Sequence, residues 1–258
     1  DAVSIRMFAD VPVGAFLSGG VDSSTVVALM KKINHDVKTF SIGFDNDNFN
    51  EAQYAKSIAK HLGTDHTELY ISSKEAQKFI PDIPKYFDEP FADSSQIPTY
   101  LISEITRKEV KVALSGDGGD ELFGGYNRYF VGQKLKMLFS LPDFAKKILI
   151  KAIGILTPDQ WNRLFKKFPR SIIPGQLGDK LYKLSNIINE DEDGFYRNLV
   201  SIWHDPENIT NNGIEKKGLI WENNFREILP DFTERMQLID ILTYLPDDIL
   251  TKVDRSSM

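Results

Sequence analysis

The chain has 258 residues, of which 41% are hydrophobic and 26% charged, and its net charge is −6. This composition is ordinary for a globular protein, and the length allows one large domain or two small ones. No apolar run reaches the ~20 residues that a membrane span needs, and no signal peptide is seen, so we expect a soluble, cytoplasmic protein. The absence of cysteine excludes disulfides and thiol nucleophiles, and the negative charge argues against nucleic-acid binding.

Strand and helix patterns alternate along the first part of the chain. The expected strands are 13–17, 37–44, 66–71 and 110–114, and the expected helices are 1–9, 21–30, 50–62, 75–87 and 96–108. Gly63 is typical of a helix C-terminus, and Pro81 and Pro84 should interrupt the fourth helix. This alternation predicts an α/β fold, with a parallel sheet and helices on both faces.

The strand signal disappears after Asp117, and the remainder has the pattern of helices and loops. We therefore expect an α/β nucleotide-binding core over 1–129 and a helical part of the same domain over 130–258. The basic stretch 133–183, with eleven Lys and Arg against three Asp and Glu, is interpreted as the solvated faces of helices.

The four histidines have no mutual metal-ligand spacing; they are His35, His61, His66 and His204. Because His66 falls in an expected strand, we predict that it is buried and hydrogen-bonded.

The segment Ser18–Ser24, SGGVDSS, lies between an expected strand and an expected helix. Its glycines let the backbone approach a ligand, and its serine hydroxyls join the helix N–H groups in a potential phosphate cradle. Asp22 would repel a phosphate unless a cation intervened, so Mg²⁺ is implied. A plain strand–turn–helix junction is the alternative. Neither G-x-x-x-x-G-K-[ST] nor G-x-G-x-x-G is present, which excludes two other nucleotide-binding motifs.

A second segment, Ser115–Tyr129, reads SGDGGDELFGGYNRY and follows the fourth expected strand. Ligands of open α/β sheets bind at the carboxyl ends of strands, where the first segment also lies. Asp117, Asp120 and Glu121 would repel one another without a cation, solvent or a basic partner. An acidic surface turn is the alternative.

Taken together, the two segments resemble the glutamine-dependent asparagine synthetases (class B), within the ATP-pyrophosphatase (PP-loop) superfamily. GMP and NAD synthetases share the first segment but not the second. Weaker matches support the resemblance; they are SIGF at 41–44, DEPFADSSQIPTY at 88–100 and YLPDDILTKVDRSSM at 244–258. The resemblance implies an adenine nucleotide alpha-hydrolase-like fold.

Roles for individual residues follow from the resemblance. Asp22 and Asp120 match its Mg²⁺-binding acids. Asp117 and Asp120 match catalytic positions, although some members have Glu at the first of these. The implied ATP and pyrophosphate contacts are Leu17, Ser18, Gly19, Gly20, Val21, Asp22, Ser23, Ser24, Ile42, Gly43, Ser115 and Gly116, with Ile42 on the adenine side. Asp93 and Ser94 match a family signature without an assigned task; an N-cap for the helix at Gln96 is the alternative.

The implied reaction joins ammonia to aspartate, with ATP as the activating substrate. ATP adenylates the side-chain carboxylate, pyrophosphate leaves, and ammonia then gives asparagine and AMP. In the family, ammonia comes from an N-terminal glutaminase domain, and a catalytic lysine lies beyond the position of Met258. We therefore expect a C-terminally truncated synthetase domain that lacks the glutaminase domain and has impaired turnover. The full-length protein is expected to be compatible with a homodimer. The alternatives are a related ligase or amidotransferase acting on another carboxylate, and an ATP-binding remnant without turnover.

Overall fold

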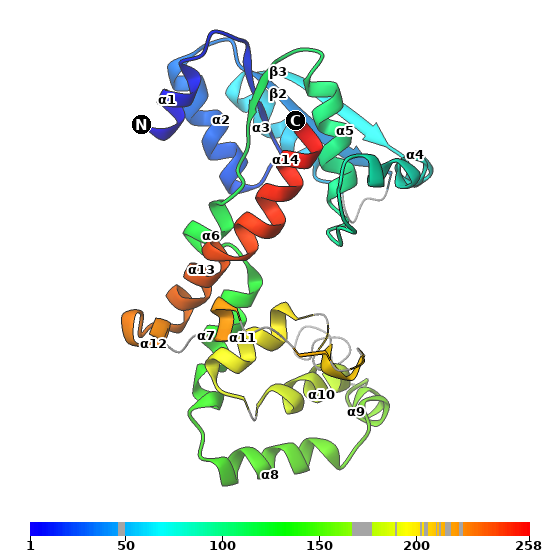
Figure 1. Ribbon diagram of the computed structural model, residues 1–258, viewed down its shortest axis with the longest axis vertical. Helices are drawn as coiled ribbons and strands as arrows, with labels where there is room; N and C mark the ends of the chain where they lie inside the picture. Colours follow the sequence, from blue (N-terminus) through cyan, green and yellow to red (C-terminus); the bar gives the residue numbers. More distant parts are fainter. Residues whose placement is uncertain are drawn as a thin grey trace. The chain divides into compact units, whose positions relative to one another are not determined.

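The computed structural model describes residues 1–45, 50–166, 177–188, 190–201, 203, 206–209, 211, 213–214, 218–221 and 224–258. His204 lies outside these residues, as does part of the basic stretch. The chain divides into two compact units, traced in Figure 1. Unit 1 comprises Asp1–Phe123 together with Ile241–Met258, and unit 2 comprises Gly124–Asp240.

A four-stranded parallel sheet forms the centre of unit 1 in the part of the chain that the structure describes. Its strands are β1 (Val13–Phe16), β2 (Lys38–Phe44), β3 (Asp65–Ile71) and β4 (Val112–Leu114), in the order β3-β2-β1-β4. Gly14 of β1 pairs with Lys38 of β2 on one side and with Ala113 of β4 on the other. The carboxyl ends of β1 and β4 are therefore adjacent.

Helices connect and cover these strands. They are α1 (Ala2–Met7), α2 (Val21–Ile33), α3 (Ala52–Leu62), α4 (Ser73–Phe79), α5 (Gln96–Thr106), α6 (Gly119–Phe123) and α14 (Thr251–Ser257). As predicted, Gly63 ends α3 in the left-handed conformation, with φ 66°. The predicted interruption at the two prolines is also observed. α4 ends at Phe79, and the chain continues as the 3-10 helix η2 (Ile80–Lys85), which contains both prolines.

The side chains of β1 alternate between the two faces of the sheet, as the strand geometry requires. Ala15 and Leu17 pack with buried residues of α2 and α3; these are Val27, Met30, Ala55 and Ala59. Phe16 packs against the other core, formed by Phe40, Ile102 of α5 and Val110. Helices therefore cover both faces, and the predicted α/β fold is confirmed.

Unit 2 is helical, and it contains no strand among the residues that the structure describes. Its helices are α7 (Asn127–Phe139), α8 (Asp143–Gly154), α9 (Pro158–Phe165), α10 (Leu177–Ile187), α11 (Glu192–Val200), α12 (Asn224–Ile228) and most of α13 (Phe232–Leu242). The core of the unit is aromatic; it consists of Tyr129, Phe139, Phe195, Tyr196, Phe232, Met236 and Ile239.

The last two helical elements of the chain, η5 (Leu245–Leu250) and α14, belong to unit 1. The π-helical turn η5 leads directly into α14, which packs against α5. Residues 241–258 thus belong to the same compact unit as the sheet. The predicted division into domains at residue 129 remains a prediction. Across the described ranges, no helix has both the length and the apolar character needed to cross a bilayer.

Candidate functional site

The loop between β1 and α2 is held by its own serines. The backbone N–H of Ser18 donates to Ser23 Oγ over 3.2 Å, and the two hydroxyl oxygens are 2.9 Å apart. Gly20 N–H donates to Ser18 Oγ. Gly19 has φ 87°, and a Cβ there would lie 2.7 Å from Tyr54 Cβ, so this position requires glycine. These contacts explain why the first motif contains both serines and glycines.

The second motif lies directly against the first. A Cβ on Gly116 would be 2.9 Å from the backbone nitrogen of Ser23. A Cβ on Gly119, the first residue of α6, would be 2.8 Å from Asp22 Oδ1. The two glycines therefore allow the loops after β1 and β4 to touch, which side chains at these positions would prevent.

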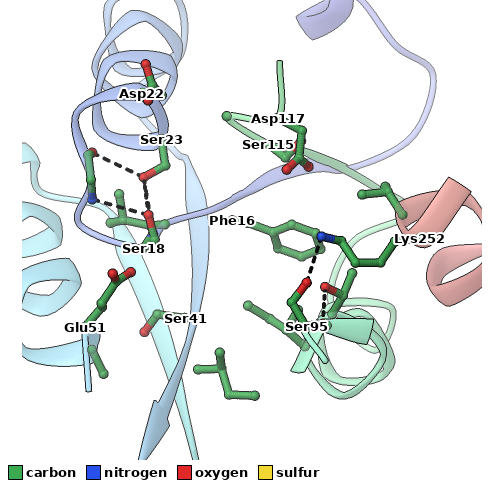
Figure 2. A pocket seen from close by; sticks show the side chains of 18 of the residues that line it. Phe16, Ser18, Asp22, Ser23, Ser41, Glu51, Ser95, Ser115, Asp117 and Lys252 are labelled. Carbon is green, nitrogen blue, oxygen red and sulfur yellow. Dashed lines mark hydrogen bonds between the residues drawn. The ribbon is translucent and has the colours of Figure 1, made fainter. Parts of the chain in front are cut away.

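The two loops border a pocket of about 380 Å³, shown in Figure 2. We call it the central pocket. A volume of this size is typical of small-molecule sites. Ten of the residues implicated by the sequence line it; they are Leu17, Ser18, Gly20, Asp22, Ser23, Ile42, Ser115, Gly116, Asp117 and Asp120. The structure thus brings residues of both motifs and of β2 around one cavity.

Four other residues implicated by the sequence do not line the central pocket. Gly19 is in contact with α3, and Val21 is 82% exposed. Ser24 Oγ donates to the carbonyl oxygen of Gly20 over 2.6 Å, which fixes the first turn of α2. A Cβ on Gly43 would lie 2.7 Å from the ring of Tyr70, so Gly43 permits close packing between β2 and β3.

Ten further residues line the central pocket, and the sequence motifs assigned a role to none of them. The polar ones are Ser41, Glu51, Ser95, Thr99 and Lys252, and the apolar ones are Phe16, Phe44, Ala52, Ile102 and Val253. Four of these polar residues lie in segments that resemble the family: Ser41 in 41–44, Ser95 and Thr99 in 88–100, and Lys252 in 244–258. Glu51 had no such signal.

Lys252 of α14 links the end of the chain to the start of α5. Its ammonium group lies 2.8 Å from Asp93 Oδ2 and 2.8 Å from Ser95 Oγ. The backbone N–H of Ser95 donates to Asp93 Oδ1. Burial raises the pKa of Asp93, but the hydrogen bonds from Lys252 and Ser95 outweigh it and hold that pKa below its ordinary value.

The N-cap alternative for Asp93 and Ser94 is wrong. Ser95 occupies the N-cap position of α5, and no side chain caps the helix there. Ser94 is exposed, whereas Asp93 is an ion-pair partner of Lys252. Asp93 therefore stabilises the contact between the start of α5 and α14 through its ion pair with Lys252.

Carboxylates dominate the charged residues in the lining of the central pocket. Asp22, Glu51, Asp117 and Asp120 all line it, while Glu121 is only 1% exposed and lies outside the lining. No group of three or more His, Cys, Asp or Glu side chains suited to a metal is found within the described ranges. Mg²⁺ commonly takes only one or two carboxylates and completes its shell with phosphate oxygens and water. Asp22 and Asp120 fit that donor set.

His66 supports the pocket from the neighbouring strand. Its Nδ1 lies 2.9 Å from Thr39 Oγ1, and its Nε2 lies 3.2 Å from Ser41 Oγ, a hydroxyl that lines the central pocket. Burial lowers the pKa of His66, partly opposed by the charge of Glu68. The expected hydrogen bonds of this histidine are confirmed, but the prediction that it is buried is wrong, because His66 is only half-buried.

Comparisons with known proteins identify the family of this chain. The family model described as asparagine synthase matches residues 1–258. The chain is 34% identical over 258 residues to Asparagine synthetase [glutamine-hydrolyzing] 1 of Bacillus subtilis, covering all of this chain and 39% of that protein. It is 39% identical over 263 residues to a protein of Methanocaldococcus jannaschii, covering 47% of it. Asparagine synthetase B [glutamine-hydrolyzing] of Escherichia coli is 32% identical over 143 residues, which is 49% of this chain and 26% of that protein. The chain therefore spans less than half the length of these relatives.

Proposed function

Since the chain belongs to the asparagine synthase family, we propose that it provides the site of an amide-forming ligase that activates aspartate with ATP. The observation that carries this proposal is the meeting of the two motifs. Gly116 and Gly119 allow the loop after β4 to touch Ser23 and Asp22 of the loop after β1, beside one pocket. Such a position, at the carboxyl ends of adjacent parallel strands, is where open α/β sheets bind nucleotides.

In this proposal the loop Ser18–Ser24 holds the pyrophosphate part of ATP. Backbone N–H groups at the start of α2 and the hydroxyls of Ser18 and Ser23 supply hydrogen bonds and partial positive charge. Ile42 of β2 borders the adenine, Gly43 next to it permits the close packing of β2 against β3, and Ser115 and Gly116 complete the nucleotide contacts. Gly19 and Ser24 act by shaping the loop, because neither lines the pocket.

Asp22 and Asp120 are the residues that would hold Mg²⁺. Both line the central pocket, and carboxylate oxygens are the hard donors that this ion takes. Bound Mg²⁺ would offset the negative charge of the phosphates.

The proposed chemistry has two steps. A side-chain carboxylate oxygen of aspartate attacks the α-phosphorus of ATP, the bond to the bridging oxygen breaks, and pyrophosphate leaves with its electrons. Ammonia then attacks the carbonyl carbon of the resulting β-aspartyl-AMP, loses a proton and expels AMP, giving asparagine. The chain itself orients the reactants and stabilises charge, and we assign Asp117 and Asp120 to this reacting region. The names of several relatives describe them as glutamine-hydrolyzing, and we propose the same source of ammonia here.

The test is ATP–pyrophosphate exchange with a panel of acids, followed by product analysis with saturating ammonia. We expect exchange that depends on aspartate, and asparagine and AMP in equal amounts. Exchange with a different acid would instead identify a related ligase for another carboxylate. Nucleotide binding without exchange for any acid would identify a binding remnant.

A further inference from the structure

The central pocket has an unusual balance of charge for its proposed substrates. Four carboxylates line it, and Lys252 is the one basic residue among the described residues of its lining. ATP and a carboxylate acceptor are both anionic, so a second anion would be repelled unless a cation received it. The position of Lys252 therefore determines which anionic group can be accommodated.

The Lys252 side chain is only 9% exposed, and its ammonium group is fixed by neighbours. An ammonium group has three donor hydrogens. Two of them are used by Asp93 Oδ2 and Ser95 Oγ. The third has no acceptor among the described residues, and the side chain lines the central pocket.

The pKa values of two carboxyl groups beside Lys252 are shifted in opposite directions. Lys252 and Ser95 hold the pKa of Asp93 low, so Asp93 remains ionised and anchors the ammonium group. Burial and the charge of Asp93 raise the pKa of Asp248, on the turn before α14. Asp93 is therefore the ionised partner that holds the ammonium group, 2.8 Å from it.

Figure 2 shows Lys252 on the opposite side of the pocket from Ser18 and Asp22, near Ser95 and the Phe16 ring. This placement matters because phosphoryl-type displacement needs the attacking and leaving oxygens roughly in line. If pyrophosphate leaves toward the Ser18–Ser24 loop, the attacking carboxylate enters from the far side. Lys252 stands on that side.

We propose that Lys252 binds a carboxylate of the acceptor through its third N–H, and that Asp93 and Ser95 hold the ammonium group in position for it. This inference rests on the proposed function and deepens it, because it assigns the acceptor end of the pocket to a residue of α14. The charge of Lys252 attracts the acceptor and keeps its carboxylate apart from the acids of the lining.

The experiment measures ATP–pyrophosphate exchange in the full-length protein, with aspartate and ATP varied separately. Lys252→Met keeps the length of the side chain and removes the charge. It should raise the KM for aspartate about 10- to 100-fold, as expected for one lost hydrogen bond to a charged group, while the KM for ATP changes less than about threefold. Lys252→Arg should recover part of the affinity for aspartate, because it restores the charge.

The matched control is Arg255→Met. Arg255 lies on the same helix and pairs with Asp88 over 2.8 Å, but its side chain is 45% exposed and does not line the pocket. This variant should leave both KM values unchanged. Ser95→Ala, which removes one acceptor of the ammonium group without changing charge, should raise the KM for aspartate by a smaller factor.

An unchanged KM for aspartate in Lys252→Met would overturn the inference, and so would an equal rise in the KM for ATP, which would assign Lys252 to the nucleotide. If Lys252→Met fails to fold, Ser95→Ala decides, and a normal KM for aspartate in that variant would refute the inference. Wild-type protein that shows no exchange with any acid would reject the proposed function and this inference together. Active wild-type protein with unaffected variants would reject only the role of Lys252.

Discussion

Asp22 in the first turn of α2 lies against Gly119, the first residue of α6, so closely that a Cβ on Gly119 would be 2.8 Å from Asp22 Oδ1. This contact joins the two motifs at the carboxyl end of the sheet. It also means that the orientation of a proposed metal-binding carboxylate depends on the absence of a side chain elsewhere in the chain.

Replacing Gly119 with alanine should therefore displace Asp22. A shift of about 1 Å at a reacting centre can cost about 100-fold in rate, and we expect exchange activity to fall on that order. Gly154→Ala is the control, because a Cβ at Gly154 meets nothing within 4 Å. Equal exchange rates in the two variants would show that the contact with Asp22 is unimportant for activity.

Asp22→Ala should weaken the binding of Mg·ATP far more than that of metal-free ATP, because the carboxylate is proposed to act through the ion. Loss of one well-placed electrostatic group typically lowers the rate by about 10²–10³. Calorimetry with and without Mg²⁺ measures the difference, and the exposed Asp36, changed to alanine, is the control. The same loss of affinity in both conditions would contradict the metal role.

His66 should make the stability of unit 1 depend on pH below about 6.5. Burial lowers its pKa in the folded chain below the ordinary 6.5, partly opposed by Glu68 and assisted by Lys56. The unfolded chain then binds more protons in that interval, so the free energy of unfolding falls as the pH drops below 6.5. Denaturant unfolding between pH 5 and 8 should show a flatter dependence in His66→Gln than in the control His61→Gln, since His61 is exposed. Identical curves would refute this coupling.

Asp248→Asn should make unit 1 more stable at neutral pH. Burial and the negative charge of Asp93 raise the pKa of Asp248 above its ordinary 3.8. The folded chain then binds the extra proton, so stability decreases as the pH rises through that pKa. The amide removes this cost. Thermal unfolding at pH 4 and pH 7 measures the effect, and a variant that loses stability at pH 7 would contradict it.

Asp240→Ala should strongly destabilise unit 2. The Asp240 carboxylate is fully buried and accepts hydrogen bonds from Arg128, Tyr129 and Tyr196. Breaking a buried ion pair by removing one partner costs about 3–5 kcal/mol, because the other charge is left unpaired. Urea unfolding followed by tryptophan fluorescence measures this loss. Arg226→Ala removes the ion pairs of the exposed Arg226 with Asp191 and Asp193. It should cost less than about 1 kcal/mol per pair, so a loss as large as that of Asp240→Ala would refute the argument.

Local physical signals in the sequence determined most of the secondary structure of unit 1. The apolar run at 13–17 predicted β1, because a strand covered on both faces needs apolar residues at successive positions. Gly63 and the prolines of the fourth helix marked real helix ends, since each restricts or permits backbone angles regardless of distant contacts. The convergence of the two motifs was also predictable, because parallel strands bring their carboxyl ends to one edge.

Only the tertiary structure decided how the end of the chain contributes to the pocket. Lys252 and Asp93 are 159 residues apart, and no local periodicity encodes their contact. Their pairing exists because α14 returns to unit 1 and packs on α5. The same holds for Glu51 in the lining and for Asp240 in its buried cluster. Sequence patterns report which face of a segment is apolar, whereas the partner of a buried charge depends on which segments the fold brings together.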